Sequence, residues 1–492
     1  MAPALEPLTA TGLLSSRLNP LQNPNPLNPI FVGALSRRRK RGNRNGGGSR
    51  CNVLCTATSP RTMSSTRYAI LGAGFAGLSV AWHLLKHTQK GSHVCVDIFD
   101  ETGIGGGASG VAGGLLHPYS PKAKLLWKGA EFWKECLELL AVAEQANNAQ
   151  RIKETDCVDG GIVLRRGILR PATSQKNVEI LIENASSCLE SCILQTLDEK
   201  AAQFLIPGLC APFDLAIYMP GAVSIQPKRY LQALFSACQN LANDQSKSTG
   251  KERIINLRTQ YVSNLHQLSE SHANHRPTRS SQFVVSEPSL DNFTGEYDSV
   301  IVCLGARVNT LPELSGKLPL RTCRGIVSEL HLPTASRGEY ADQSPSILSD
   351  AWLAFQGPRQ VYMGSTWDWN SKIYDQNVSK EECARATEEL ISRASIFYPE
   401  IRRWSLVGAK AGLRAMPPLT ENGSVPLLGC LNDLIGDRTN CMFWLVGGLG
   451  ARGLLYHGLV GKLTSQAAIS CDESVIPFEF IDWKKRMPCI VS

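Results

Sequence analysis

Apolar and polar residues follow two different periods along the chain, and these periods predict strands and helices in alternation. Residues 68–85 contain no formally charged side chain, and a stretch of about this length is enough to cross a lipid bilayer. Glycines at positions 72, 74 and 77 interrupt the stretch. A strand, a tight turn and a helix ending near His87 therefore fit it better than one membrane helix. Residues 93–99 are typical of a second strand.

The rest of the chain continues this alternation. Helices are predicted at residues 125–145, within 175–205 and, after a glycine turn, at 221–238. Strands are predicted within 159–172, near 260–265, at 297–306 and within 318–369, and the polar segment 267–296 is predicted to loop out. Residues 443–467 repeat the opening order of strand, glycines and helix. Segments that suit a nucleotide-binding domain thus alternate with segments of a strand-rich second domain.

This alternation predicts an α/β protein with an interleaved domain order. The dinucleotide-binding domain is expected in three parts and the strand-rich domain in two: residues 66–155, 221–317 and 406–480 for the first, and residues 156–220 and 318–405 for the second. Residues 1–62 belong to neither. We see no internal repeat and no second candidate for a membrane-spanning helix.

Charge sets the first 65 residues apart from the rest. They hold nine Arg or Lys residues and one acid, Glu6, so they account for the whole net charge of +8 and leave the remainder neutral. Such a basic, Ser- and Asn-rich segment is typical of an organelle transit peptide. Six prolines before residue 30 argue against an amphipathic mitochondrial presequence, so residues 1–62 predict import into the chloroplast stroma. A disordered tail and a nuclear signal at residues 37–41 are the alternatives.

The 16 cysteines are scattered, with no Cys-x-x-Cys pair and no zinc spacing. This distribution is typical of small buried residues in a reducing compartment rather than of a disulfide framework. We predict no metal site.

The glycine-interrupted stretch has the spacing G-x-G-x-x-G, and each glycine has a physical task. Gly72 makes the turn, Gly74 lets the backbone approach a pyrophosphate, and Gly77 lets the helix pack close to the strand. The helix N-terminus offers free N–H groups to the phosphates. Asp100 follows the second strand at the place of a ribose-binding acid, whereas Asp97 lies within the strand and is expected to be structural. A second glycine-rich segment, residues 103–118, predicts close backbone contact with a ligand.

Four motifs together resemble the D-amino-acid oxidase superfamily of FAD enzymes: GAGFAG with Asp100, GASGVAGGLLHP, GLRAMPPLTENGSVPLLG (residues 412–429) and GGLGARGLL (residues 447–455). The resemblance covers about residues 66–470 and is weak at 175–215. It is closest to the C-terminal oxidoreductase domain of the bacterial bifunctional protein that makes methylaminomethyl-thiouridine in tRNA; no methyltransferase half is present. It implies a Rossmann-like FAD-binding domain interleaved with a strand-rich α+β substrate domain.

The resemblance also implies which residues hold FAD. Those expected at the pyrophosphate, ribose and adenine are Gly72, Gly74, Phe75, Ala76, Gly77, Asp100, Glu101, Val262 and Gly305. Those expected near the flavin are Ala108, Ser109, Gly113, Gly114, Leu115, Gly448, Leu449, Gly450, Ala451, Arg452, Gly453 and Leu454, with Leu455 at the end of the last run. A helix N-terminus at residues 449–455 would stabilise negative charge on the flavin ring.

Three side chains are candidates for substrate chemistry. Arg414 matches the family arginine that grips a substrate carboxylate, a task that suits a planar guanidinium. Arg452 lies one position after the equivalent arginine of glycine-oxidase-like members, where this chain has Ala451, and this departure favours the tRNA-enzyme branch. His117 is expected in the flavin pocket or packed in the core. Arg324–Gly325 resembles the family's hairpin into the substrate domain, and Trp367 and Asp368 are weaker candidates for the pocket floor.

These features predict an FAD-dependent oxidoreductase that oxidises the C–N bond of an amino acid or secondary amine bearing a carboxylate. Hydride would pass to flavin and the imine would hydrolyse. Carboxymethylaminomethyl-uridine of organellar tRNA is an alternative substrate, with Arg165, Arg166 and Arg170 as a local basic patch; the neutral body of the protein weighs against it. A flavin-binding assembly protein without turnover is another alternative. A NAD-dependent enzyme is disfavoured by the interleaved glycine segments.

Overall fold

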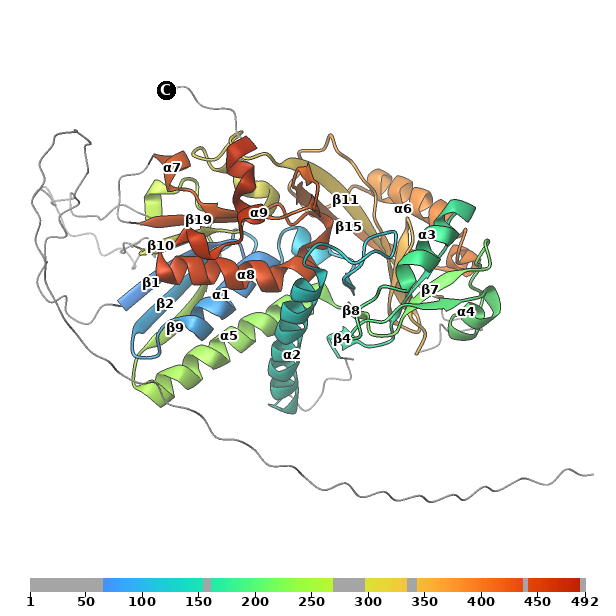
Figure 1. Ribbon diagram of the computed structural model, residues 1–492, viewed down its shortest axis with the longest axis horizontal. Helices are drawn as coiled ribbons and strands as arrows, with labels where there is room; N and C mark the ends of the chain where they lie inside the picture. Colours follow the sequence, from blue (N-terminus) through green and yellow to red (C-terminus); the bar gives the residue numbers. More distant parts are fainter. Residues whose placement is uncertain (1–64, 154–160, 269–296, 334–342, 437–440, 487–492) are drawn as a thin grey trace, which may run out of the picture. The chain divides into compact units, whose positions relative to one another are not determined.

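The computed structural model describes residues 65–153, 161–268, 297–333, 343–436 and 441–486 (Figure 1). They all belong to one folded unit, residues 61–492. The predicted transit segment at residues 1–62 lies outside the described residues, as does the predicted loop at residues 267–296 except for residues 267 and 268, which belong to the 3-10 turn His266–Leu268.

A mostly parallel sheet of six strands forms the nucleotide-binding part. Its strands lie in the order β18-β19-β10-β1-β2-β9, and all neighbours are parallel except β18 and β19. The bounds are β1 Ser65–Leu71, β2 His93–Phe99, β9 Arg253–Arg258, β10 Ser299–Val302, β18 Leu427–Cys430 and β19 Met442–Gly447. The predicted strands at residues 93–99 and 297–306, and the late strand near residue 443, are confirmed.

Both faces of this sheet are covered, which explains why its strands have continuous apolar runs. Side chains of Tyr68 and Ile70 enter one core, and those of Ala69 and Leu71 enter a second core on the opposite face. The first core is closed by helices that lie in front of the sheet in Figure 1. They are α1 Phe75–His87, α2 Gly129–Lys153, α5 Pro227–Thr249 and α8 Gly453–Ser470.

A second sheet of eight strands forms the strand-rich part, in the order β15-β11-β14-β13-β12-β5-β7-β6. All neighbouring strands are antiparallel except β12 and β5. The bounds are β5 Ile168–Pro171, β6 Gln195–Leu197, β7 Ala216–Met219, β11 Arg321–His331, β12 Ser346–Ile347, β13 Trp352–Gly357, β14 Gln360–Gly364 and β15 Ser405–Met416. Its own core includes Leu353, Phe355 and Trp404.

Shorter elements complete the described chain. The strands β3 Leu115–Leu116, β4 Val163–Leu164 and β8 Val223–Ile225 form a small sheet, and β16 Leu419–Thr420 pairs with β17 Gly423–Ser424. The remaining α-helices are α3 Gln175–Ala185, α4 Glu199–Leu205, α6 Lys380–Ala394, α7 Asn432–Ile435 and α9 Phe478–Ile481. The 3-10 turn η1 spans Ala108–Val111, and η5 spans Gly450–Arg452.

Three predicted elements are shifted in the structure. The helix expected after the glycine turn at residues 221–238 is α5, which begins only at Pro227, because the short strand β8 precedes it, and continues to Thr249. The strand expected near residues 260–265 is β9, at Arg253–Arg258, because Gly250 ends helix α5 with a φ of 65° and the chain pairs with β2 directly afterwards. The helix expected at residues 125–145 begins at Gly129 and continues to Lys153. The predicted domain bounds stay a prediction, although β15 pairs with β11 and so places residues 405–416 in the eight-stranded sheet.

Within the described residues, no helix is both long and apolar enough to cross a membrane. The cysteines of this part of the chain are free thiols, and it holds no group of three or more His, Cys, Asp or Glu side chains arranged to bind a metal ion.

Candidate active site

A cavity of about 790 Å³ is lined by segments of both large sheets. We call its two sides the glycine wall and the arginine wall. The glycine wall consists of lining residues from 71–76, 99–102, 107–115 and 449–455; the arginine wall consists of Arg170, Gly325, Trp352, Ser365, Trp367, Gly412 and Arg414. The first wall contains several glycines, and the second contains arginine and tryptophan side chains.

The turn between β1 and α1 leaves no room for side chains at its glycines. A Cβ on Gly72, whose φ is +106°, would lie 2.6 Å from the carbonyl oxygen of Cys303, and one on Gly74 would lie 2.8 Å from Oγ of Ser109. At Gly77 a Cβ would lie 1.9 Å from the carbonyl oxygen of Gly72. Gly77 does not line the cavity; it lets α1 pack against the turn, as its position in the motif predicts.

The first turn of α1 is left open for an anion. The N-cap residue Gly74 has no side chain to accept a hydrogen bond, and the turn contains no acidic residue. The N–H of Phe75 donates to Oγ of Ser109 at 3.1 Å. The following N–H groups have no partner within the helix, because an α-helix leaves its first N–H groups unpaired. This end of α1 can therefore receive a phosphate.

Asp100 and Asp97 lie in different surroundings, Asp100 at the cavity and Asp97 in the core. Asp100 lines the cavity, and its carboxylate accepts hydrogen bonds from the N–H groups of Ala73 at 2.8 Å and Thr102 at 3.0 Å. Asp97 is fully buried. Burial alone would raise its pKa, but hydrogen bonds to its carboxylate, first from Asn256 and Tyr297, outweigh burial and lower the pKa below the ordinary value.

Helix α8 also points its N-terminus at the cavity. Its first turn contains no acidic residue, its N-cap Arg452 makes no side-chain capping bond, and all of residues 449–455 line the cavity. The carbonyl of Leu454 is fixed from behind, where it accepts hydrogen bonds from Nδ1 of His457 at 2.6 Å and from Sγ of Cys136 at 3.0 Å. The positive end of this helix dipole can stabilise negative charge on a ligand.

Trp352 is fixed in the arginine wall by two glycines. A Cβ on Gly113 or on Gly364 would lie 2.6 Å from its indole ring, so the ring fits between the two backbones. The segment 107–115 thus contacts the eight-stranded sheet directly. A further close approach joins Gly412 of β15 to η1, where a Cβ would lie 3.0 Å from Cα of Ala108.

Arg414 presents its guanidinium to the cavity from β15. Its Nη2 donates to the carbonyl of Thr366 at 2.9 Å, and Nη1 and Nε make longer bonds, both 3.4 Å, to Oγ of Ser365 and the carbonyl of Cys323. The Trp367 ring covers the guanidinium, with its centroid 4.2 Å from Cζ. Among the described residues no carboxylate pairs with Arg414. Burial lowers its pKa, but an arginine stays protonated at neutral pH.

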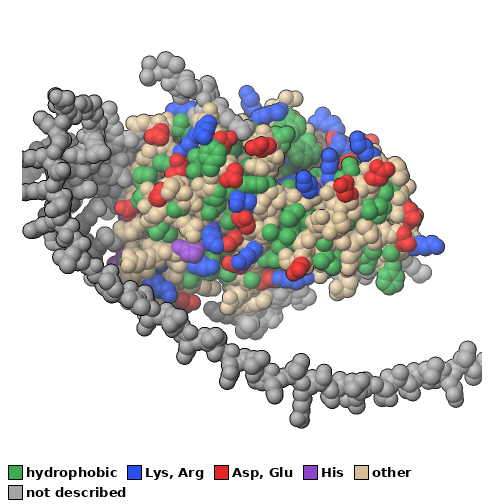
Figure 2. Space-filling view, in the orientation of Figure 1, with side chains coloured by type: hydrophobic (Ala, Val, Ile, Leu, Met, Phe, Trp, Pro, Cys, Tyr) green, Lys and Arg blue, Asp and Glu red, His purple; other side chains and the backbone are tan. Residues whose placement is uncertain are grey.

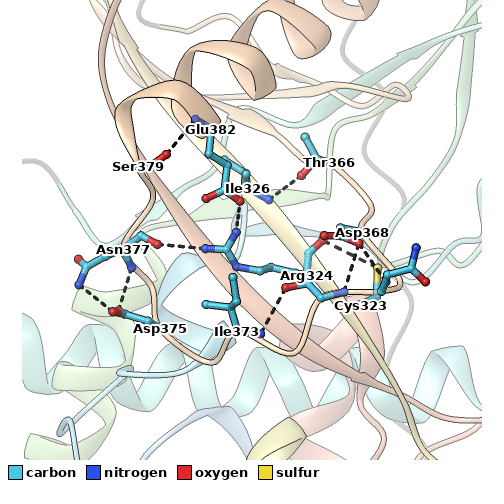
Figure 3. A network of polar contacts seen from close by, with 12 residues as sticks. Cys323, Arg324, Ile326, Thr366, Asp368, Ile373, Asp375, Asn377, Ser379 and Glu382 are labelled. Carbon is cyan, nitrogen blue, oxygen red and sulfur yellow. Dashed lines mark hydrogen bonds and ion pairs between the residues drawn. The ribbon is translucent and has the colours of Figure 1, made fainter.

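A network of polar contacts around the buried Arg324 fixes the segment that carries the partners of Arg414 (Figure 3). The guanidinium of Arg324, on β11, does not line the cavity and donates to Glu382 and to the carbonyl of Asn377. The backbones of Arg324 and Asp368 exchange hydrogen bonds of 2.8 and 2.9 Å. Arg324 therefore attaches the segment after β14 to β11 and to the first turn of α6.

A second group of basic side chains lies near His117. Nδ1 of His117 accepts a hydrogen bond from the N–H of Tyr119 at 3.3 Å, so the neutral ring carries its proton on Nε2. Burial, followed by the positive charges of Arg452 and Arg170, lowers its pKa to about 3. Nε of Arg170 and Nη1 of Arg452 are buried and have no hydrogen-bond partner within the described part of the chain.

Most of the predicted site residues come together in this cavity. Those that line it are Gly72, Gly74, Phe75, Ala76, Asp100, Glu101, Ala108, Ser109, Gly113, Gly114, Leu115, His117, Val262, Gly305, Arg414, Leu449, Gly450, Ala451, Arg452, Gly453 and Leu454. Gly77 and Gly448 are not among the lining residues. Asp368 is not one either, because its carboxylate accepts hydrogen bonds from the N–H groups of Asn370 and Ser371. The individual roles of the predicted site residues toward a ligand stay predictions.

Sequence reasoning missed Trp352 and misplaced Arg170. An aromatic residue at the start of a strand is an ordinary core residue in sequence, and only the two flanking glycines reveal its position. Arg165, Arg166 and Arg170 do not form one basic patch. Arg165 makes two 2.6 Å hydrogen bonds to Glu144, Nη1 of Arg166 is buried, and Arg170 lines the cavity.

FAD fits this donor set. The open first turn of α1 suits a pyrophosphate, the Asp100 carboxylate at the end of β2 suits a ribose hydroxyl, and the N-terminus of α8 suits the electron-accepting ring. The glycines at which a Cβ would collide line the same path, so the backbone can approach such a ligand closely.

Comparison with solved structures shows the same fold in two oxidases. Glycine oxidase from Geobacillus kaustophilus is 18% identical, with a TM-score of 0.60 over 87% of this chain and 100% of that one. Iminodiacetate oxidase from Chelativorans sp. BNC1 is 21% identical, with a TM-score of 0.55 over 84% and 98% of the two chains. At these identities the likeness concerns the fold alone.

Sequence comparison points the same way. A Rhizobium etli protein, provisionally named thiamine biosynthesis oxidoreductase ThiO, is 29% identical over 183 residues, which are 35% of this chain. The match spans about half of that relative, 46% of its length. Closeness to the bacterial tRNA-modifying protein stays a prediction. The family model for FAD dependent oxidoreductases, DAO, matches residues 67–467, and the chain therefore belongs to the DAO family of FAD-dependent oxidoreductases.

Proposed function

We propose that this enzyme oxidises the C–N bond of a primary or secondary amine that carries a carboxylate. The observation that carries the proposal is Arg414, a cation in the wall of the FAD cavity without a carboxylate partner among the described residues. A guanidinium has five N–H groups, and three of them are directed at Cys323, Ser365 and Thr366. The other two are available for a bidentate bond to a carboxylate.

The basic side chains of the cavity also favour the reactive form of the amine. Nearby positive charges disfavour a protonated amine, and Arg414, Arg170 and Arg452 all line the cavity. They lower the pKa of an amine bound among them, so that its nitrogen lone pair becomes available. FAD, when bound, accepts the hydride that leaves the carbon next to this nitrogen, and water then hydrolyses the resulting imine.

Other side chains position the substrate and limit the access of water. The Trp352 ring, fixed between Gly113 and Gly364, provides a rigid apolar surface. His117 is neutral and has Nδ1 occupied by the N–H of Tyr119, so it offers a hydrogen-bond donor rather than a base. The proposed chemistry depends on orientation more than on a protein base. The names of the similar structures, glycine oxidase and iminodiacetate oxidase, are consistent with a small amino acid as substrate.

Substitution of Arg414 tests the proposal. Arg414→Ala should lose about 3 kcal/mol of interaction with carboxylate-bearing amines, as is usual when one partner of a buried charge pair is removed. Arg414→Lys should recover only part of this, because an ammonium cannot form the planar fork. The measurement is anaerobic flavin reduction by sarcosine and, as the carboxylate-free comparison, by N-methylbenzylamine.

Arg321→Ala is the matched control. Arg321 also covers a tryptophan, Trp369, at 4.8 Å, but it does not line the cavity. The Arg321→Ala variant should leave flavin reduction by both amines unchanged, and FAD content should be the same in all variants. An equal loss for amines with and without a carboxylate, or a loss of FAD in Arg414→Ala, would contradict the assignment.

A second candidate substrate is carboxymethylaminomethyl-uridine in tRNA, which bears the same carboxylate and amine. The observation in its favour is a pair of exposed tryptophans, Trp367, which lines the cavity, and Trp369, which does not; they are 45% and 41% exposed. Their centroids are 6.1 Å apart, and unpaired bases stack on such rings. On the face in Figure 2, however, Lys and Arg side chains are interspersed with Asp and Glu. Flavin reduction by hypomodified tRNA, compared with fully modified tRNA, separates this candidate from a small-molecule enzyme.

A further inference from the structure

Arg170, in the arginine wall, and Arg452, in the glycine wall, both line the cavity, and neither takes part in the hydrogen bonds of Arg414. Arg170 lies on β5 in the eight-stranded sheet, and Arg452 lies at the N-terminus of α8. His117 lines the same cavity, and the positive charges of Arg452 and Arg170 contribute to the lowered pKa of its ring. The three residues thus line one cavity, although they come from positions 117, 170 and 452 of the chain.

The hydrogen-bonding capacity of these two guanidinium groups is not fully used. Nε of Arg170 and Nη1 of Arg452 are buried without a hydrogen-bond partner in the described residues. Asp350, an exposed residue in the turn between β12 and β13, also lines the cavity and acts on the charge of Arg170. Like charges repel each other more strongly in a protein than in water, so a bound anion would stabilise the two guanidinium groups.

We infer that Arg170 and Arg452, with the Nε2–H of His117, form a second anion-binding subsite, and that the substrate is an amine with two acidic groups. This inference rests on the proposed function, in which Arg414 holds the first carboxylate. An amine flanked by two carboxylates, such as iminodiacetate, has the matching chemistry. A guanidinium fork accepts a carboxylate or a phosphonate equally well, so the second acidic group is defined by its charge.

Thioether analogues test the subsite without turnover. Thiodiacetate carries two carboxylates and (methylthio)acetate carries one, and neither has an amine to be oxidised. Isothermal titration of the FAD-loaded enzyme should give a lower dissociation constant for thiodiacetate, by at least tenfold. Arg170→Met should remove this advantage. It should raise the dissociation constant of thiodiacetate ten- to hundredfold and change that of (methylthio)acetate less than twofold. The range corresponds to the loss of hydrogen bonds between charged groups.

Two further variants complete the experiment. Arg165→Met is the matched control, because Arg165 lies five positions earlier, pairs with Glu144 and does not line the cavity; it should leave both dissociation constants unchanged. Arg452→Met provides the second test if Arg170→Met does not fold, and it should also weaken thiodiacetate selectively. FAD content is measured for each variant.

The outcomes separate the subsite from the proposed function. Selective weakening of thiodiacetate supports the subsite even if no amine reduces the flavin, a result that would contradict only the proposed function. Equal weakening of both ligands, an unchanged preference in Arg170→Met, or FAD loss together with unchanged ligand selectivity would overturn the subsite. With iminodiacetate and N-(phosphonomethyl)glycine as substrates, the same variants show whether the second group is a carboxylate or a phosphonate.

Discussion

The two walls of the cavity are built in different ways. The glycine wall is made of backbone from a few short segments, each with its own sequence motif, and its shape depends on the absence of side chains. The arginine wall is made of single side chains that strand pairing collects from distant positions, 170, 325, 352, 365–367 and 412–414. From this difference we expect that one Cβ added at a glycine motif disrupts FAD binding by the whole glycine wall. Substitution of one side chain in the arginine wall should remove only the contact that this side chain makes.

The largest expected effect is at Gly77, which supports the glycine wall from behind. Gly77→Ala would place a Cβ 1.9 Å from the carbonyl oxygen of Gly72, and neither backbone can move without separating α1 from β1. We expect a loss of about 3 kcal/mol of folding stability, the upper end of the usual cost of overpacking, and little or no bound FAD. The measurements are the ratio of flavin to protein absorbance and thermal unfolding.

Gly91→Ala is the control for this prediction, because a Cβ there has nothing within 4 Å. It lies in the turn that follows α1, so it tests the same βαβ unit. A Gly77→Ala enzyme with a full complement of FAD would show that the close contact is not needed to form the phosphate-binding turn.

The next effect concerns the support of the arginine wall. Glu382→Gln leaves Arg324, whose side chain is 3% exposed, without its carboxylate partner. Breaking a buried ion pair costs about 3–5 kcal/mol, and we expect about 2 kcal/mol because Glu382 is 27% exposed. The midpoint of urea unfolding should fall. FAD content should stay unchanged, because Arg324 does not line the cavity.

Glu381→Gln is the control, since Glu381 lies in the same first turn of α6 but has no part in the pair. The double variant Arg324→Met/Glu382→Leu should recover much of the lost stability, because it removes both charges. Loss of FAD in Glu382→Gln at full folding would show that the two walls do not respond separately.

This contrast explains how much the sequence predicted. The glycine wall follows from local spacing, and the strands at residues 93–99 and 299–302 were predicted because parallel strands buried on both faces are apolar runs. Val262 lines the cavity as expected. It does not lie on the expected strand, because the chain forms that strand earlier, at residues 253–258. Arg170 was assigned to a surface patch and Trp352 was not noticed. Their positions depend on which strands pair across the eight-stranded sheet, and sequence periodicity does not specify pairing.

A smaller effect is expected at Gly325, where β11 passes beneath Arg414. A Cβ on Gly325 would lie 2.0 Å from Nη2 of Arg414, and this contact can be relieved because the end of an arginine side chain moves. Gly325→Ala should therefore leave folding and FAD content nearly unchanged but weaken carboxylate binding about tenfold, or about 1.4 kcal/mol. The readout is the dissociation constant of (methylthio)acetate.

A double-mutant cycle makes this prediction sharper. In the Arg414→Ala background, Gly325→Ala should cause no further loss of carboxylate binding, because the side chain that it displaces is absent. Gly357→Ala, on β13, is the control because a Cβ there has nothing within 4 Å. Additive losses in the double variant would mean that Gly325 affects the ligand directly.

The last effect is a pH dependence that arises behind the glycine wall, at His457. The ring is fully buried; its Nε2 accepts a 2.6 Å hydrogen bond from Tyr230, and its Nδ1–H donates to the carbonyl of Leu454. Burial lowers its pKa from 6.5 to about 4. As the pH falls from about 6.5 toward 4, the unfolded chain takes up a proton at this position and the folded protein does not. The free energy of unfolding therefore falls with decreasing pH, by up to about 1.4 kcal/mol per pH unit for one histidine.

His457→Gln should reduce this slope by the contribution of one proton, in urea unfolding measured between pH 4.5 and 7 with FAD in excess. Above pH 7 the variant should show only the constant cost of the altered hydrogen bonds. His117→Gln should reduce the slope in the same way, because the pKa of His117 is lowered to about 3. The two variants differ at the ligand. His117 lines the cavity and His457 does not, so only His117→Gln should change the affinity for thiodiacetate. An equal change in both would mean that the glycine wall transmits the protonation of His457 to the substrate side of the cavity.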